Sequence, residues 1–317
     1  MFKNKKLGRE RLLIVGCGDI GMRCITLLKE RFRIFALTSD KNRMSHLRQQ
    51  GATPILGNLD HPETLNRIRH LADKILHFAP PPACGNVDSR TPALLAKLAY
   101  PSRQRKILPH SFKQQTEVFR KTRVIYTSTS GVYGDCHGQW VDETHPVKPI
   151  TARAKRRVSA EGFLRQFAKR ASDIHTNRFI AILRVPGIYS ESRLPEERLK
   201  KGLPILKSDE DVFTNHIHSE DLAKIAVSAL FRAKPGRIYH AVDDSAMTMG
   251  EYMEKVADQL GLARPPRVAM TQIKTLLSEV QMSFLRESRR LSNRRLKQEL
   301  RYRLIFPTIA DSWKKSQ

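Results

Sequence analysis

The sequence has no long hydrophobic run and few cysteines, and both shortages narrow the class of protein. No stretch of about 18 uncharged apolar residues is present, so we expect no membrane-spanning segment. The four cysteines, Cys17, Cys24, Cys84 and Cys136, form no CxxC pair and show no metal-ligand spacing. Scattered thiols are typical of a reducing compartment, so we expect a cytoplasmic protein without a disulfide framework or a metal site.

Acidic residues are also scarce relative to basic ones. The chain has 57 Lys plus Arg against 31 Asp plus Glu, a net charge of +26 and a pI near 10.3. Basic runs at 101–123, 153–157 and 286–303 would attract polyanions, including nucleic acid or a phosphate-bearing substrate. These runs lack the spaced aromatic residues of a base-stacking surface. We therefore favour a solvated basic surface over nucleic-acid binding.

Short apolar segments alternate with amphipathic ones along the 317 residues. The segments expected to be strands are 12–15, 34–37, 53–56, 75–78, 124–127, 179–184 and 238–242, and those expected to be helices are 19–31, 41–50, 61–71, 155–171, 219–233, 249–261 and 270–287. Near-continuous apolar strands are typical of parallel sheets buried on both faces. We therefore predict an α/β Rossmann-type fold, with a doubly wound parallel sheet and a smaller interleaved C-terminal substrate lobe.

The same pattern suggests how the domains divide. Residues 1–185, completed by 212–245, are expected to form the nucleotide-binding Rossmann domain, and residues 186–211 and 246–317 the smaller lobe. The basic, poorly patterned stretch 101–121 is interpreted as an insertion.

A glycine-rich motif follows the first expected strand and opens the first expected helix. It runs from Gly16 through Gly18, Asp19 and Ile20 to Gly21. In this context Gly16 permits a tight turn, Gly18 lets the backbone approach a pyrophosphate, and Gly21 lets helix and strand pack closely. The alternative, a glycine-rich turn without a ligand, is disfavoured by the strand and helix on either side. The motif therefore predicts dinucleotide binding.

The end of the second strand bears on which dinucleotide is bound. Thr38 and Ser39 occupy the expected ribose-contact positions without a carboxylate, while Lys41 or Arg43 would neutralise a 2′-phosphate. These residues favour NADP. If the strand extends two residues further, Asp40 becomes the ribose ligand and NAD is preferred, and NAD therefore stays open.

The motifs together resemble the atypical and extended short-chain dehydrogenases, also described as NAD-dependent epimerase/dehydratase-like proteins. The resemblance runs almost end to end and rests on the glycine turn and on segments 57–60, 78–82, 126–134, 183–189, 215–223 and 292–297. It implies that Asn58 and Leu59 lie near the adenine, that Ala79 and Pro80 line the cofactor, and that Pro186 lies near the nicotinamide. The family more often has Asp in place of Asn58.

The catalytic residues are where the sequence departs from this family. Active members use a Ser or Thr to hold the substrate oxygen, a Tyr as acid/base, and a Lys four residues later that lowers the tyrosine pKa. Thr129 matches the hydroxyl position, but Arg153 and Arg157 stand at the Tyr and Lys positions. Arg157 is a candidate to bind the cofactor ribose, whereas Arg153 cannot donate and recover a proton at ordinary pH.

Other residues are candidates for the missing chemistry. Tyr133 is a candidate substitute acid/base, although a packed tyrosine is the favoured interpretation. His216 and His218 are interpreted as structural, with His218 and Asp221 matching family residues that position the second lobe. The candidates to border a substrate cleft are Tyr189, Phe213 and Asn215.

Two functions remain open. One is an NAD(P)-dependent oxidoreductase or epimerase/dehydratase-like enzyme with a modified site and a small-molecule substrate. The alternative is a non-catalytic NAD(P)-binding sensor or regulatory protein that engages an acidic partner through its basic surface. Because cations at 153–157 would repel a symmetric copy, we expect a monomer or a weak homodimer.

Overall fold

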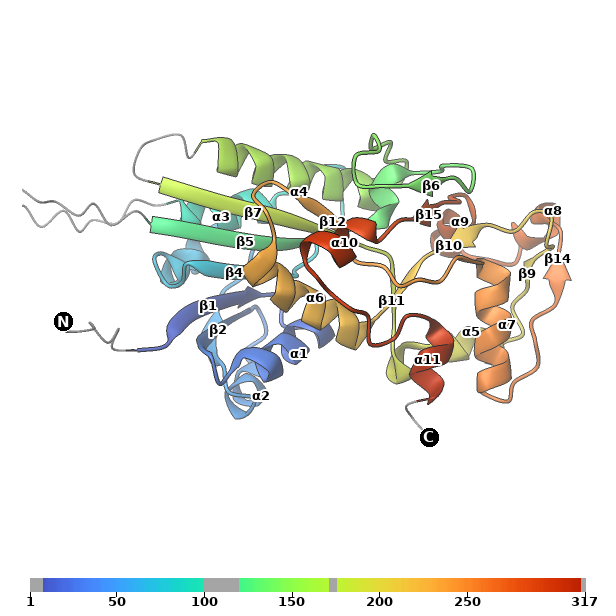
Figure 1. Cartoon of the computed structure of the whole chain (residues 1–317), viewed down its shortest axis with the longest axis horizontal. Helices are drawn as coiled ribbons and strands as arrows, with labels where there is room; N and C mark the ends of the chain where they lie inside the picture. The colour runs from blue at the N-terminus through green and yellow to red at the C-terminus, as the bar shows by residue number, and fades with distance from the viewer. Residues whose placement is uncertain (1–7, 100–119, 171–175, 315–317) are drawn as a thin grey trace, which may run out of the picture. The chain divides into compact units, whose positions relative to one another are not determined.

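The computed structural model describes residues 8–99, 120–170 and 176–314. Its main sheet consists of β1 Glu10–Val15, β2 Phe32–Thr38, β3 Thr53–Leu56, β4 Lys74–His77, β5 Arg120–Thr129, β7 Thr176–Val185 and β12 Ile238–His240 (Figure 1). The strand order is β12-β7-β5-β4-β1-β2-β3, and β1 pairs in parallel with both β2 and β4. This order, with β1 inside and the chain turning back after β3, confirms the predicted doubly wound α/β fold.

Helices connect these strands and build the remainder of the chain. Their bounds are α1 Asp19–Leu28, α2 Arg43–Gln49, α3 Arg90–Leu98, α4 Ala152–Lys169, α5 Glu196–Lys200, α6 Ser219–Arg232, α7 Met249–Gln259, α8 Met270–Ile273, α9 Glu279–Leu285, α10 Arg294–Glu299 and α11 Ile309–Lys314. The short strands are β6 Trp140–Val141, β8 Gly187–Tyr189, β9 Ile205–Leu206, β10 Phe213–Thr214, β11 His216–His218, β13 Met247–Thr248, β14 Arg267–Val268 and β15 Arg290–Leu291. None of the helices in the described ranges is long and apolar enough to cross a membrane.

The central strands are buried on both faces, as their apolar sequences predict. Leu12, Leu13 and Ile14 of β1 are fully buried, and Figure 1 shows α1 on the near side of the sheet and α3 on its far side. From Leu12 to Val15, side chains on both faces of β1 are therefore removed from water. This core fixes the strand ends from which the loops of the predicted nucleotide site emerge.

Two of the expected helices differ from the prediction, and four helices in the described part of the chain were not predicted. The expected helix 61–71 is a 3₁₀ helix at Pro62–Ile68. The expected helix 270–287 is broken into α8 and α9, because Ser278 begins the second one by accepting a hydrogen bond from the Gln281 N–H. The helices that were not predicted are α3, α5, α10 and α11.

The chain divides into two compact units. Unit 1 consists of residues 1–127, 156–182 and 226–237, and unit 2 of residues 128–155, 183–225 and 238–317. Residues 128–155, which the sequence analysis placed in the first domain, group with unit 2 because β6 within them pairs with β15. The proposed insertion 101–121 lies almost wholly outside the described residues.

Candidate functional site

The glycine turn of unit 1 combines two tightly packed positions with one open position. Gly16 has φ +90°, and a Cβ there would lie 2.4 Å from the backbone nitrogen of Ala79. A Cβ on Gly21 would lie 2.6 Å from the carbonyl oxygen of Gly16, whereas a Cβ on Gly18 would meet nothing within 4 Å. Gly16 and Gly21 therefore let neighbouring backbone segments pack closely. Gly18 leaves space in front of the N-terminus of α1, where an anion is favoured.

The two residues after Gly18 have different surroundings. The carboxylate of Asp19 accepts a hydrogen bond from Arg23 Nε at 2.8 Å, one turn along α1. Ile20 is 8% exposed and belongs to the core. Only their backbone N–H groups, which head α1, suit the dinucleotide contact expected of this turn.

At the end of β2, Arg43 is tied to the glycine turn. Its Nη2 donates to the carbonyl oxygen of Cys17. Thr38 ends the strand, and its Oγ1 accepts from the Asp40 N–H at 3.2 Å, while the Asp40 carboxylate accepts from the Asn42 N–H at 2.9 Å. A guanidinium therefore lies beside the turn, and one oxygen of the Asp40 carboxylate is bound by the backbone that precedes α2. Ser39 is exposed.

The loops after β3 and β4 are joined by an ion pair. Arg90 donates to both carboxylate oxygens of Asp60 at 2.7 and 2.6 Å, and to the carbonyl oxygen of Pro80 at 3.1 Å. These hydrogen bonds lower the pKa of Asp60. The Ala79 N–H donates to Val15 at 3.0 Å, so the loop after β4 is also held against the end of β1. Three adjacent loops of unit 1 are thereby fixed.

The two residues expected near the adenine lie in the first of these loops. The side-chain oxygen of Asn58 accepts from the Asp60 N–H at 3.0 Å, and the Asn58 N–H donates to Thr64 Oγ1 at 2.9 Å. Leu59 is 8% exposed. Asn58 thus shapes the turn with its own side chain.

Arg157, on α4, is anchored to the end of β5 within unit 1. Its Nη1 donates to the Thr127 carbonyl oxygen at 2.7 Å and to the Tyr126 hydroxyl at 3.0 Å. Burial raises the pKa of Tyr126 to about 12. Burial also lowers the pKa of His77, whose ring centroid lies 5.0 Å from that of Tyr126, to about 3. Arg157 is therefore the fixed cation at this strand end, beside two groups that stay neutral.

In unit 2, Thr129 is half-buried and Tyr133 is almost fully buried. Thr129 Oγ1 accepts a hydrogen bond from the Gly131 N–H at 3.3 Å. Tyr133 is 1% exposed, and its hydroxyl lies 2.5 Å from His240 Nε2 and 3.2 Å from the carbonyl oxygen of Asp142. The guanidinium of Arg184 lies 4.7 Å from the centre of the Tyr133 ring. These contacts favour the packed interpretation of Tyr133, while Arg153 is exposed on α4 and covers Phe284.

The histidine-containing segment of unit 2 is structural in its contacts. His216 stacks on Tyr252 with ring centroids 3.9 Å apart, and burial lowers its pKa to about 3. Asn215 donates to the Arg289 carbonyl oxygen at 2.9 Å and accepts from the Leu291 N–H at 2.8 Å. Asp221 accepts from the Tyr302 hydroxyl at 2.7 Å. The described residues hold no cluster of His, Cys, Asp and Glu that would bind a metal.

Pro186 links β7 to β8 in unit 2 and is partly exposed. The other cleft candidates, Tyr189 and Phe213, lie on short strands of this unit, Tyr189 buried at the end of β8 and Phe213 half-buried at the start of β10. No contact within unit 2 gives Pro186 a role of its own.

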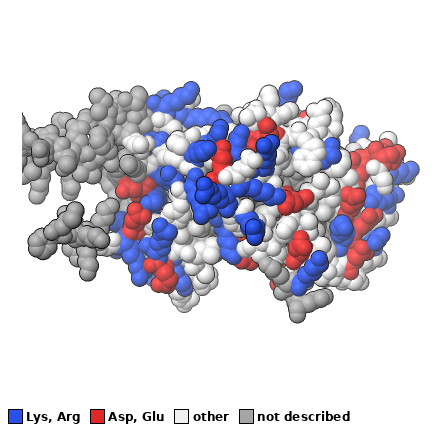
Figure 2. Space-filling view, in the orientation of Figure 1, with Lys and Arg blue, Asp and Glu red and all other residues white. Residues whose placement is uncertain are grey.

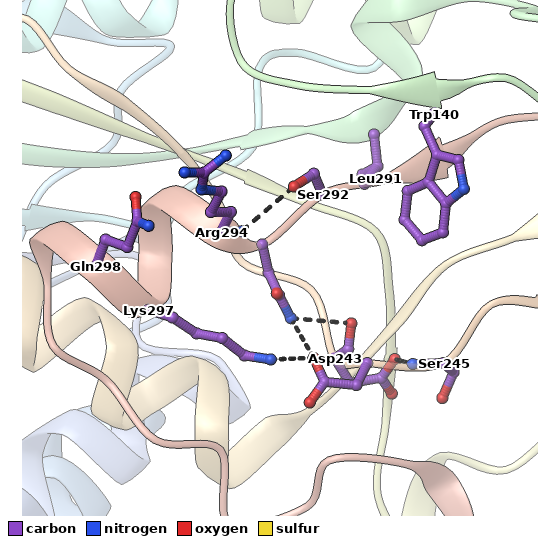
Figure 3. Close-up of a pocket in the computed structure, with 10 residues that line it drawn as sticks. Trp140, Asp243, Ser245, Leu291, Ser292, Arg294, Lys297 and Gln298 are labelled. Carbon is purple, nitrogen blue, oxygen red and sulfur yellow. Dashed lines mark hydrogen bonds and ion pairs between the residues drawn. The ribbon is translucent and has the colours of Figure 1, made fainter.

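Unit 2 also contains a pocket of about 430 Å³ that the sequence analysis did not anticipate (Figure 3). It is lined by Trp140, Asp243, Asp244, Ser245, Leu291, Ser292, Asn293, Arg294, Lys297 and Gln298. On one side, Asn293 Nδ2 and Lys297 Nζ both contact Asp244 Oδ1, at 2.7 and 2.5 Å. Figure 3 shows Trp140 across the pocket from Lys297.

Glu287 and Arg289 were not predicted from the sequence. Their side chains are mostly buried, and Glu287 Oε2 would lie 3.8 Å from a Cβ on Gly131. They fall in the run 286–303, which was interpreted only as basic surface. An acidic residue inside a basic run was the one available signal.

Comparisons with known proteins agree with this architecture. Human dTDP-D-glucose 4,6-dehydratase is 25% identical over 130 residues, which are 38% of this chain and 35% of that protein. Protein YeeZ of Escherichia coli K12 is 29% identical over 146 residues, 46% of this chain and 49% of that protein. The chain therefore matches about a third of the dehydratase and about half of YeeZ.

Solved structures cover nearly the whole chain. A functionally unknown conserved protein of Silicibacter pomeroyi is 27% identical, with a TM-score of 0.71 over 96% of this chain and 97% of that one. UDP-glucose 4-epimerase of Thermotoga maritima with UDP-glucose is 16% identical, with a TM-score of 0.70 over 96% of each chain. A double mutant of DesIV, the dTDP-glucose 4,6-dehydratase of Streptomyces venezuelae, with NAD bound, is 19% identical with a TM-score of 0.70 over 97% of each chain. The last two likenesses show the fold alone.

The sequence pattern of one protein family matches most of the chain. It is the NAD-dependent epimerase/dehydratase family, and it matches residues 12–241. This range contains the glycine turn, the ends of β2 to β5 and Thr129. Since the match extends over well more than half of the chain, the protein belongs to the NAD-dependent epimerase/dehydratase family.

Proposed function

We propose that the protein is an NAD(P)-dependent enzyme that oxidises a hydroxyl group of a nucleotide-sugar-like substrate, as a dehydrogenase or as the first step of an epimerase or dehydratase reaction. The observation that carries this proposal is the open position at Gly18, which faces the N-terminus of α1 between two glycines that cannot carry a side chain. A pyrophosphate suits this position, because it needs close backbone approach and unpaired N–H groups.

The residues present fit a dinucleotide, which supplies a hydride acceptor when bound. The backbone N–H groups of Asp19 and Ile20 head α1 and would bind the pyrophosphate. The family is NAD-dependent. Acceptance of NADP is the finer proposal, supported by Thr38 at the end of β2 and by the guanidinium of Arg43 beside the turn.

For the chemistry in unit 2, we assign to Thr129 the task of holding the substrate oxygen. Among the described residues its hydroxyl accepts one hydrogen bond, from the Gly131 N–H at 3.3 Å, and its own proton is available to donate. Tyr133 is assigned a structural role, because its hydroxyl is engaged with His240 in the interior. The non-catalytic sensor is not favoured by the comparisons, which include dehydratases and an epimerase.

The cellular compartment and the oligomeric state are proposed from the cysteines and from the charges on α4. All four cysteines are free thiols, which supports a reducing compartment such as the cytoplasm. A monomer or weak homodimer is supported by the exposed Arg153 and Lys155 on α4.

The test is turnover of UDP-glucose and dTDP-glucose, the sugar nucleotides named for the structural neighbours, with NAD or NADP. Reduced nicotinamide would be followed by absorbance and sugar products by NMR. We expect Thr129→Val to lower kcat by about 10²-fold or more, since it removes an oriented hydrogen-bond donor, and Tyr133→Phe to retain kcat while lowering Tm. A folded wild type that binds the dinucleotide but converts neither sugar nucleotide would contradict the proposal.

A further inference from the structure

An ion pair in unit 1 joins two segments that are far apart in the sequence. Arg90 Nε and Nη2 donate to the two carboxylate oxygens of Asp60 at 2.7 and 2.6 Å, in the bidentate geometry that strengthens such pairs. Asp60 lies in the loop after β3, and Arg90 is the first residue of α3, which follows β4. The pair therefore fixes the segment after β3 against the segment after β4.

These two segments leave the sheet from strands that are not neighbours. In the strand order, β1 and β2 lie between β4 and β3. Neighbouring strands are about 4.8 Å apart, so the ends of β3 and β4 are separated by roughly 14 Å. The four strands are parallel, so the ion pair lies at the same edge of the sheet as the glycine turn after β1.

Both segments also contact the strands between them. The Gly57 N–H donates to the carbonyl oxygen of Thr38, at the end of β2, at 2.9 Å, and the Ala79 N–H donates to that of Val15, at the end of β1, at 3.0 Å. The two segments thus lie directly beside the ends of β2 and β1, where a dinucleotide bound at the glycine turn would place its ribose and pyrophosphate. Their conformation therefore bears on how the adenosine half is held.

The backbone at Arg90 is fixed independently of the ion pair. Asp88 is fully buried, and its carboxylate accepts hydrogen bonds from the Arg90 N–H at 3.0 Å and the Thr91 N–H at 3.2 Å. The Asp88 N–H in turn donates to Ser159 Oγ at 3.2 Å. Helix α3 therefore begins at a fixed place, from which the guanidinium of Arg90 extends to Asp60.

The same guanidinium orders the loop between β4 and α3. Residues 78–89 of this loop contain no helix or strand. Arg90 Nη1 donates to the carbonyl oxygens of Pro80 and Pro81, at 3.1 and 3.5 Å, so the end of the loop is bound to its beginning. A loop that is not ordered in the free protein loses conformational freedom when a ligand binds, and this loss weakens binding. A loop that is already ordered avoids the loss.

We propose that Asp60 and Arg90 are positioning residues for the adenosine half of the dinucleotide, and that they hold segments 57–60 and 78–82 in the binding conformation before the ligand arrives. The inference rests on the proposed function. Arg90 is assigned no direct contact with a phosphate group, because its Nε, Nη1 and Nη2 already donate to protein oxygens. The pair therefore acts on dinucleotide affinity through the two loops.

The test is calorimetric titration with NAD and with ADP, which contains the adenosine and the pyrophosphate but no nicotinamide. Asp60→Asn keeps an oxygen that accepts from Arg90, and Arg90→Met keeps a side chain of similar length, so both variants should fold. We expect Arg90→Met to raise Kd by about tenfold for both ligands, and Asp60→Asn to raise it by a smaller factor. Arg90→Lys keeps the charge without the bidentate geometry and should recover part of the loss. Because the two residues act as a unit, the double variant should bind no more weakly than Arg90→Met alone.

A matched control breaks an ion pair at the opposite ends of two of these strands. Lys74 Nζ lies 2.9 Å from Glu10 Oε2, and the two residues are the first of β4 and β1. We expect Glu10→Gln to leave both Kd values unchanged. An equal rise in Kd in Glu10→Gln would overturn the inference, since the effect would then be general to the fold.

A merely structural pair would lower Tm and leave the Kd of the folded protein unchanged. Wild-type Kd values in folded Arg90→Met and Asp60→Asn would therefore overturn the inference alone. A folded wild type that binds neither NAD nor ADP would overturn the proposed function and this inference with it.

Discussion

Asp243 is a buried carboxyl group whose ionisation opposes folding. It is 2% exposed, and its Oδ1 accepts a hydrogen bond from the Ser245 N–H at 3.0 Å. Burial raises its pKa from 3.8 to about 8. The native state therefore keeps a proton that the unfolded state has released, so the contribution to stability falls as pH rises from about 4 to about 8.

Asp243→Asn should remove this dependence, because the amide stays neutral at every pH. Each unit of pKa difference corresponds to about 1.4 kcal/mol, so we expect the variant to gain Tm over the wild type progressively as pH rises. The measurement is Tm by circular dichroism between about pH 5 and about pH 9. Asp244→Asn, at an exposed carboxylate paired with Lys297, is the matched control. Parallel Tm curves for Asp243→Asn and the wild type would contradict the buried, protonated state.

Individual site residues were predictable only where a local pattern identified them. Gly16, Gly18 and Gly21 follow from a strand-turn-helix pattern, and Thr129 from a segment that resembles the family. The pocket that Trp140 and Lys297 line could not be found in this way, since these residues are brought together by chain folding and not by spacing in the sequence. The packing of Tyr133 against His240 is likewise a tertiary contact between residues far apart in the chain.

The glycines in the turn between β1 and α1 have different surroundings. Gly16→Ala would place a Cβ 2.4 Å from the Ala79 nitrogen at a backbone φ of +90°. We expect it to cost about 1–3 kcal/mol or more through overpacking and strain. Gly18→Ala meets no atom within 4 Å and should retain the wild-type Tm. Thermal unfolding of both variants tests this, and equal loss in the two would show that the turn is packed differently.

The seven strands of the sheet could be predicted because each buried one is a nearly continuous apolar run. Helix boundaries were less predictable where local chemistry competes with periodicity. Pro62 begins a 3₁₀ helix where an α-helix was expected, and the cap at Ser278 divides the expected helix 270–287. Helix α3 was missed because it follows the proline-rich stretch 80–82 and contains Pro92 in its first turn.

The excess of basic residues, a net charge of +26, is a property of the whole molecule. Figure 2 shows Lys and Arg gathered near the centre of the visible face, over the region of α10. Two of the exposed cations there are Arg294 and Lys297, of which Lys297 is paired with Asp244. Such a surface raises the local concentration of anions, including phosphate-bearing substrates, without specifying one of them. The sequence predicted this attraction from composition alone.

Binding of the dinucleotide is the claim on which the function of the whole molecule depends. It is tested most directly by calorimetric titration of the intact protein with NAD, NADH, NADP and NADPH, alongside Gly18→Asp as a variant that crowds and repels a pyrophosphate. We predict saturable binding to the wild type that is lost in Gly18→Asp, at an unchanged Tm because the position is open. A folded wild type that binds none of the four, or a variant that binds as tightly as the wild type, would contradict the account.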